Sequence, residues 1–202
     1  PGLGQVSSFL GMAWGDATTG VAVGTGGRIV RTLNGGVSWT QVPNSGENLV
    51  DVEFADGNTA VAVGEYTILR TVDGGASWST ISAPSVNSWA LSFANASVGF
   101  IINSLGTRLW RTDDAGLTWV QVDAALPVIY GTRDIWFTSP LDGYIVAAEE
   151  ILHTNDGGLH WERYRTEEDM RQLHFRSMQD GLCVGENGTL IRTSPIGNYS
   201  PI

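Results

Sequence analysis

The sequence predicts an all-β protein built from five similar units of four antiparallel strands, and three observations lead to this prediction. A motif of the form Thr-x-Asn/Asp-Gly-Gly-x-Ser-Trp starts at Thr32, Thr71, Thr112 and Thr154, with a partial copy at Thr193. A spacing of about 40 residues is typical of proteins that repeat one supersecondary unit. Short segments with alternating apolar residues precede each copy, and 26 glycines indicate many tight turns.

Each unit contains four short segments with strand character. The first alternates and ends in an aromatic residue, the second is a continuous apolar run, the third ends at the motif threonine, and the fourth follows the motif. The first segments are 9–14, 49–54, 88–93, 132–137 and 170–175; the second are 21–23, 61–63, 100–102, 144–146 and 182–184; the third are 29–32, 68–71, 109–112, 151–154 and 190–193. Four antiparallel strands per repeated unit predict a β-propeller with five blades.

The motif itself is interpreted as a hairpin clip between the third and fourth strands. Two adjacent glycines allow backbone angles that a Cβ would resist, and an Asn or Asp side chain accepts hydrogen bonds from turn N–H groups. The tryptophan that follows buries a large apolar surface. A carboxylate held by turn amides is not free for proton transfer, so these residues are expected to be structural: Asn34, Trp39, Asp73, Trp78, Asp114, Trp119, Asp156 and Trp161.

The arginines before the motif threonine recur in four of the five copies, as Arg31, Arg70, Arg111 and Arg192, with His153 in the remaining one. We expect each to lie on a neighbouring tryptophan or to pair with an acid between blades. A cationic ring for an acidic partner is the alternative.

The ends of the chain are expected to complete one blade together. The fifth unit stops before its fourth strand, and residues 3–6 align with residues 39–42. We therefore predict that the N-terminal strand completes the last blade and hides its open edge. The chain is then a single propeller domain, residues 1–202, with units at about 8–42, 48–81, 87–122, 129–164, and 170–193 plus 1–6. A fragment of a longer ring is the alternative.

The composition of the chain narrows the classes of partner and cofactor that we expect. A net charge of −10 disfavours nucleic acid as a partner, because phosphate binding depends on cationic contacts. No apolar stretch is long enough to predict membrane insertion. The single cysteine, Cys183, replaces aliphatic residues of the other copies and is expected to be a core thiol. The histidines show no metal-ligand spacing, so neither a metal nor a cofactor is predicted, and we expect a monomer.

The motif resembles the Asp-box, also called the BNR repeat, and the match extends over essentially the whole chain. The longer unit, seen at residues 20–32 and 181–193, is similar to the photosystem II stability/assembly factor family. This resemblance implies an exported protein, periplasmic, lumenal or secreted, that binds partner proteins of the photosynthetic membrane. Family members are generally seven-bladed rings, whereas this chain has five units.

Candidate site residues lie on the first strands and at the channel mouth. The connections between second and third strands share one face with the segments that join consecutive blades, and the clips lie on the other. Polar residues opposite the apolar stripe of the first strands are suited to an ion or a sugar, or simply to a hydrated channel. The candidate binding residues are Asp51, Glu53, Asp134, Trp136, Gln172, His174, Arg133 and Arg171.

Two hypotheses follow for the function. The first is a non-enzymatic binding or assembly module that presents its loop face to a protein or glycan, with no catalytic residue. The second is a small glycosidase-like or glycan-binding enzyme that uses carboxylates at the channel mouth. A sialidase-like site is not supported, because Arg133, Arg171 and Tyr130 lack an Arg-Ile-Pro start and a Tyr–Glu pair. Free carboxylates with raised pKa values in a deep pocket would favour the enzyme.

Overall fold

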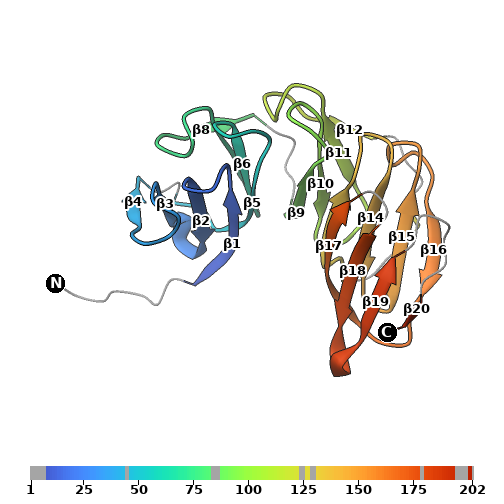
Figure 1. Cartoon of the computed structure of the whole chain (residues 1–202). Coiled ribbons are helices and arrows are strands. Elements are labelled where there is room, and N and C mark those ends of the chain that lie inside the picture. Colours follow the sequence, from blue (N-terminus) through green and yellow to red (C-terminus); the bar gives the residue numbers. More distant parts are fainter. Residues whose placement is uncertain are drawn as a thin grey trace.

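The protein, a computed structural model, is all-β and consists of five four-stranded antiparallel sheets (Figure 1). The structure describes residues 8–43, 46–82, 87–122, 126–127, 131–177, 180–193 and 200–201. Within each sheet the strands lie side by side in sequence order. The predicted fold class is confirmed. None of the helices in these ranges is long and apolar enough to cross a membrane.

The sheets follow one another along the chain and are numbered 1 to 5. Sheet 1 contains β1 (Phe9–Trp14), β2 (Gly20–Gly24), β3 (Ile29–Thr32) and β4 (Thr40–Val42), and sheet 2 contains β5 (Leu49–Phe54), β6 (Ala60–Gly64), β7 (Ile68–Thr71) and β8 (Ser79–Ile81). Sheet 3 contains β9 (Ser88–Phe93), β10 (Gly99–Asn103), β11 (Leu109–Thr112) and β12 (Val120–Gln121). Sheet 4 contains β13 (Asp134–Phe137), β14 (Gly143–Ala147), β15 (Glu150–Thr154) and β16 (Glu162–Arg165), and sheet 5 contains β17 (Met170–Ser177), β18 (Asp180–Gly185), β19 (Leu190–Thr193) and β20 (Ser200–Pro201). Two short 3-10 turns, η1 (Thr25–Gly27) and η2 (Glu186–Gly188), join β2 to β3 and β18 to β19.

The fourth strand of sheet 5 differs from the one we expected. It is β20, from the C-terminal end of the chain, and Ser200 pairs with Arg192 of β19. The position expected for the N-terminal strand is therefore filled from within the same unit, and residues 1–7 lie outside the described residues. A short hairpin closes a much smaller loop than a pairing between the two ends of the chain, so its entropic cost is lower.

The hydrophobic core is divided into layers, one between each sheet and the next. Each sheet has a front face toward the preceding sheet and a back face toward the following one. In sheet 2, Val52, Ala62 and Leu69 lie on the front face and pack against sheet 1. Val61 and Val63 lie on the back face and pack against sheet 3. Both faces of the second strand are thus buried, which explains its continuous apolar sequence.

The motif forms a compact turn, here called the clip turn, in each of the first four sheets. In the first, the Thr32 hydroxyl donates to Asn34 Oδ1 (2.9 Å), and the Gly36 and Ser38 N–H groups donate to Thr32 Oγ1 and Asn34 Oδ1 (3.0 and 2.9 Å). Both glycines have positive φ, 68° at Gly35 and 86° at Gly36. The same bonds recur in the turns that begin at Thr71, Thr112 and Thr154.

The clip turn of sheet 3 contains a strained residue that offers a simple stability test. Ala115 stands at the first glycine position and has φ 56°. Because an L-residue pays about 1–2 kcal/mol in this left-handed region, Ala115→Gly should stabilise the protein by about 0.5–1 kcal/mol after the entropic cost of glycine. Urea denaturation measures the change. The same substitution at Ala76, which follows the glycine pair of sheet 2, should destabilise or leave stability unchanged.

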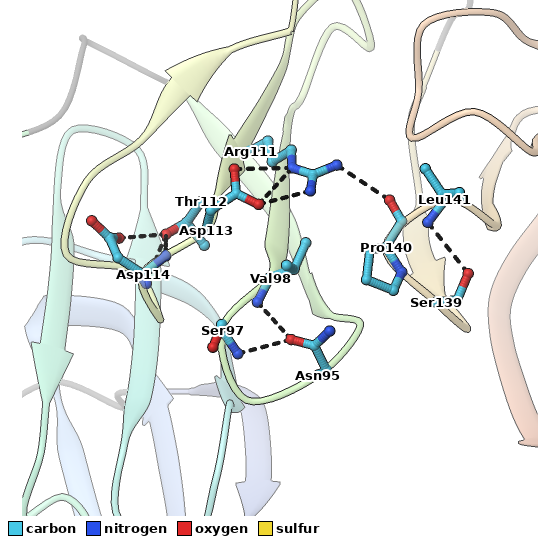
Figure 2. Close-up of polar contacts among 11 residues, drawn as sticks. Asn95, Ser97, Val98, Arg111, Thr112, Asp113, Asp114, Ser139, Pro140 and Leu141 are labelled. Carbon is cyan, nitrogen blue, oxygen red and sulfur yellow. Dashed lines mark hydrogen bonds and ion pairs between the residues drawn. The ribbon is translucent and has the colours of Figure 1, made fainter.

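The arginines before the clip turns connect consecutive sheets. Arg31 Nη2 donates to the main-chain oxygen of Asp73 (3.2 Å), and Arg70 Nε donates to that of Ala115 (2.8 Å). Arg111 Nη1 reaches the main-chain oxygen of Pro140 (3.3 Å), while its Nη2 pairs with Asp113 within its own sheet, as Figure 2 shows. For these three arginines the expected role between blades is observed, but the partners are main-chain carbonyls and not tryptophans or carboxylates of the next sheet. His153 and Arg192 lie instead beside Asp142 and Asp180 of their own sheets.

Candidate binding face

The two ends of the sheets carry different kinds of connection. At one end, here called the loop end, the connections inside a sheet meet the segments that join sheets: Gly26 N–H donates to Asn48 Oδ1 (2.7 Å), and Glu186 N–H to the Asp169 oxygen (2.9 Å). At the opposite end, the turn end, the clip-turn Gly35 donates to the Thr18 oxygen (2.9 Å). Of the loops proposed for the candidate face, residues 44–45, 83–86 and 123–125 lie outside the described residues.

Three of the predicted site residues are carboxylates on the first strand of their sheets, and each accepts hydrogen bonds from the main chain of the next sheet. Asp51 Oδ2 accepts from Leu91 N–H (2.9 Å), and Glu53 Oε2 accepts from Phe93 N–H (2.6 Å). Asp134 repeats the pattern on sheet 5, where its Oδ2 accepts from Leu173 N–H (2.9 Å). These side chains therefore join the first strands of neighbouring sheets.

The environment of these carboxylates shifts their pKa values upward. Burial raises the pKa of Asp51 to about 7 and that of Asp134 to about 6. The pKa of Glu53 lies well above its usual 4.5, because the carboxyl is buried and the charge of Asp51 repels it. The main-chain N–H bonds act in the opposite direction, since they favour the charged form. These hydrogen bonds thus offset part of the cost of burying each charged carboxylate, but ionisation of each group remains less favourable than in water.

The other first-strand candidates have different surroundings. Trp136 meets His174 edge-on, with ring centroids 5.1 Å apart, and it also packs near Phe175. His174 and Gln172 are exposed on the back face of sheet 5. Among the described residues, no group of three or more His, Cys, Asp or Glu side chains is arranged to hold a metal ion. The negative charge of Asp134 contributes to the raised pKa values of Asp51 and Glu53, so the structure brings these three carboxylates near one another.

The two predicted arginines lie at the loop end, each opposite an acid. Arg133 Nη2 is 3.6 Å from Asp169 Oδ2, and both side chains are about one-third exposed or less. Arg171 pairs with Glu186, and both of these side chains are nearly half exposed. Sheets 4 and 5 thus present a charged surface at the loop end.

Three exposed apolar side chains at the loop end of sheets 2 and 3 were only partly predicted. Tyr66, in the β6–β7 connection, is 70% exposed, and Trp89, the second residue of β9, is 42% exposed. Leu105 lies in the β10–β11 connection, and its neighbour Ser104 donates to the Asn87 oxygen just before β9. Tyr66 belonged to the expected loop face, whereas Trp89 and Leu105 did not stand out. The only sequence signal was an aromatic residue at an early strand position that is aliphatic in the first two units.

Consecutive four-stranded antiparallel sheets, packed face to face around their first strands, define the protein as a β-propeller type. No family model matches the sequence, and no curated protein matches it either.

Solved structures are similar in fold. A structure described as YCF48 bound to D1 peptide has a TM-score of 0.74 and 24% identity over 98% of this chain and 69% of that chain. YCF48 from Cyanidioschyzon merolae gives 0.74 and 16% identity, over 99% and 73%. Virginiamycin B lyase from Staphylococcus aureus gives 0.79 and 12% identity, over 98% and 70%. At these low identities, the TM-scores show a shared fold.

Proposed function

We propose that this chain is a non-enzymatic binding module whose loop end holds an extended segment of a partner protein. The observation that carries the proposal is that three apolar side chains, Tyr66, Trp89 and Leu105, are exposed at the same end of two adjacent sheets. Aromatic side chains that gather on one surface are suited to binding, because they bury a large area and lose little entropy.

The charged part of the loop end complements this group. Arg133 and Arg171 each face one acid across an accessible ion pair. Such pairs contribute little to stability and can exchange their acids for the carboxylates of a bound segment. A peptide that crosses the loop end would then meet apolar contacts on sheets 2 and 3 and charged contacts on sheets 4 and 5.

The similarity to YCF48 bound to D1 peptide supports a peptide as the ligand class. On the same grounds, we propose that the repeated turns are of the Asp-box type and that the chain is related to the photosystem II assembly factors. We also propose that the chain is a monomer with an extracytoplasmic location, and that a glycan is the alternative partner.

Peptide binding tests this function. We expect the D1 peptide, or peptides selected from a phage-displayed random library, to bind the wild-type chain. Trp89→Ala should weaken binding about tenfold or more, because truncation of a central aromatic contact typically costs more than about 1.4 kcal/mol. Leu117→Ala is the matched control, since Leu117 is an exposed apolar residue at the turn end. Titration calorimetry measures both. Selected peptides that bind equally well to the Trp89 and Tyr66 variants would disprove the proposed surface.

A glycan-active enzyme is the second candidate, and the raised pKa values of Asp51 and Asp134 favour it. The geometry favours it less, because both oxygens of each carboxylate already accept main-chain N–H bonds. Hydrolysis of a chromogenic glycoside by the wild-type chain, and not by Asp134→Asn, would decide for the enzyme.

A further inference from the structure

Two asparagines in the sequence are followed directly by glycine, Asn34 before Gly35 and Asn187 before Gly188. Asparagine is one of the thermolabile residues of proteins. Its side-chain amide is lost when the main-chain nitrogen of the next residue attacks the Cγ carbon, and glycine favours this attack because it has no Cβ and its backbone rotates freely. The two pairs carry the same reacting groups, so the structure decides how fast each reacts in the folded chain.

Several hydrogen bonds of the clip turn of sheet 1 hold Asn34 in place. Its Oδ1 accepts from the Thr32 hydroxyl and the Ser38 N–H group (both 2.9 Å), and its Nδ2 donates to Ser38 Oγ (2.8 Å). The attacking nitrogen is engaged as well, because the Gly35 N–H group donates to the Thr18 oxygen (2.9 Å). Reaction at Asn34 therefore requires the clip turn to open.

Asn187 lies in a more open place. It belongs to η2, the connection between β18 and β19, where both Asn187 and Gly188 are exposed. Asn187 has φ 51°, in the left-handed region that asparagine enters more readily than most residues, and Gly188 follows at φ 77°. A Cβ on Gly188 would meet nothing within 4 Å beyond its chain neighbours, whereas one on Gly35 would lie 3.3 Å from the Ala17 oxygen. The chain around Asn187 thus has room to rotate.

The side chain of Asn187 is also held by fewer bonds. Its Nδ2 donates to Glu168 Oε2 (2.8 Å), and Glu168 is its one hydrogen-bond partner among the described residues. Within the connection itself, the Thr189 N–H group donates to the Glu186 oxygen (2.9 Å). An exposed connection with so few bonds opens at a low cost in free energy.

We propose that Asn187 is a site of spontaneous deamidation, through which the loop end of sheet 5 gains a negative charge as the protein ages. The Gly188 nitrogen bonds to Asn187 Cγ and gives up its proton, and the side-chain nitrogen leaves with this proton as ammonia. Water then opens the resulting succinimide ring at either carbonyl carbon, which leaves an aspartate in the normal or the β-linked form. The clip turn protects Asn34 from the same reaction.

The new carboxylate changes the electrostatics of the loop end. It cannot donate to Glu168, and it follows Glu186 directly in the sequence, so repulsion between like charges replaces a hydrogen bond. Glu186 pairs with Arg171 across an exposed ion pair, which the added charge also faces. The site depends only on the surroundings of the asparagine, so this inference does not rest on the proposed function.

Incubation of the folded chain in mildly alkaline buffer tests the proposal. Peptide mapping by tandem mass spectrometry, with digestion at low pH, follows the mass increase of deamidation at each asparagine. In the folded chain we expect Asn187 to react about tenfold or more faster than Asn34, because Asn34 must wait for local opening. In the chain unfolded by guanidinium the two should react at similar rates, which is the matched control for their sequence context.

Two variants separate the reaction from its protection. Asn187→Gln keeps an amide but requires a larger ring to close, and it should remove most of the charge gain seen by anion exchange. Thr32→Val removes the hydroxyl that bonds Asn34 Oδ1 and the Gly36 N–H group, and it should bring the rate at Asn34 toward that at Asn187. Equal rates at Asn34 and Asn187 in the folded wild-type chain would overturn the proposal. An Asn34 rate that Thr32→Val leaves unchanged would contradict the protection by the clip turn.

Discussion

Gly116→Ala should lower the free energy of unfolding by about 3 kcal/mol. Gly116 has φ 83°, where an L-residue loses about 1–2 kcal/mol, and its new Cβ would meet Val61 of sheet 2 at 2.3 Å. Overpacking of a close interface typically adds about 1–3 kcal/mol. Urea denaturation followed by tryptophan fluorescence measures the sum.

Gly36→Ala is the matched control for this change. Its φ is 86°, nearly the same, but its nearest neighbours among the described residues are the Trp14 and Trp39 rings of its own sheet, at 3.4 Å or more. It should therefore cost only the backbone term, about 1–2 kcal/mol. Equal losses at the two positions would show that the interface contact contributes nothing.

The second large effect concerns pH. Asp51 and Asp134 have folded-state pKa values of about 7 and about 6, above the ordinary 3.8, and the pKa of Glu53 is also raised. Between pH 4 and 7 the folded state therefore binds more protons than the unfolded state, and stability falls as the pH rises through this range. We expect the protein to be less stable at pH 8 than at pH 5 by about 2 kcal/mol, after allowance for partial solvent access.

The clip-turn carboxylates act in the opposite direction at lower pH. Burial is the largest single influence on Asp73 and Asp156 and acts to raise their pKa values, but the hydrogen bonds from clip-turn residues together outweigh it and lower both pKa values to about 2. Their contribution is present above pH 4 and is lost as the pH falls toward 2. Stability should therefore be greatest near pH 4, the ordinary pKa of these carboxylates, where the two opposing effects meet.

The Asp51→Asn variant separates the effect of the buried first-strand carboxylates on stability from the effect of the clip-turn carboxylates. The amide cannot ionise, so the stability difference between this variant and the wild type should change by about 1–2 kcal/mol between pH 5 and pH 8, in favour of the variant at pH 8. Thr40→Ser, a change between two uncharged side chains at an exposed position of β4, is the control and should keep a constant difference. Chemical denaturation at several pH values provides the measurement. A wild-type stability that is flat or rises from pH 5 to pH 8 would contradict the expectation.

The repeat made most of the fold predictable. The predicted first strands 9–14, 49–54 and 88–93 coincide with β1, β5 and β9, because alternation and a terminal aromatic residue are strong local signals. β20 was not predictable in the same way. It has two residues, Ser200 and Pro201, and such a short strand has no periodicity.

The site was predictable as a set of polar positions but not as an arrangement. The sequence identified Asp51, Glu53 and Asp134 as inward polar residues on the first strands. Their partners are main-chain N–H groups about one repeat further along, and every residue except proline carries such a group, so no side-chain pattern marks them. The same reason explains why the carbonyl partners of Arg31 and Arg70 were not foreseen. Trp89 gave little signal because strands commonly contain aromatic residues.

The hydrogen bonds between sheets also bear on how the chain acquires its structure during synthesis. The bonds from Asp51 and Asp134 to the following sheet span 40 and 39 residues, and the Arg70 bond spans 45. Each therefore joins units that leave the ribosome one after the other. A newly made sheet can pack on a neighbour that is already folded, without waiting for a distant part of the polypeptide. Assembly can thus proceed from the N-terminal unit onward, with one exposed apolar face at the growing end.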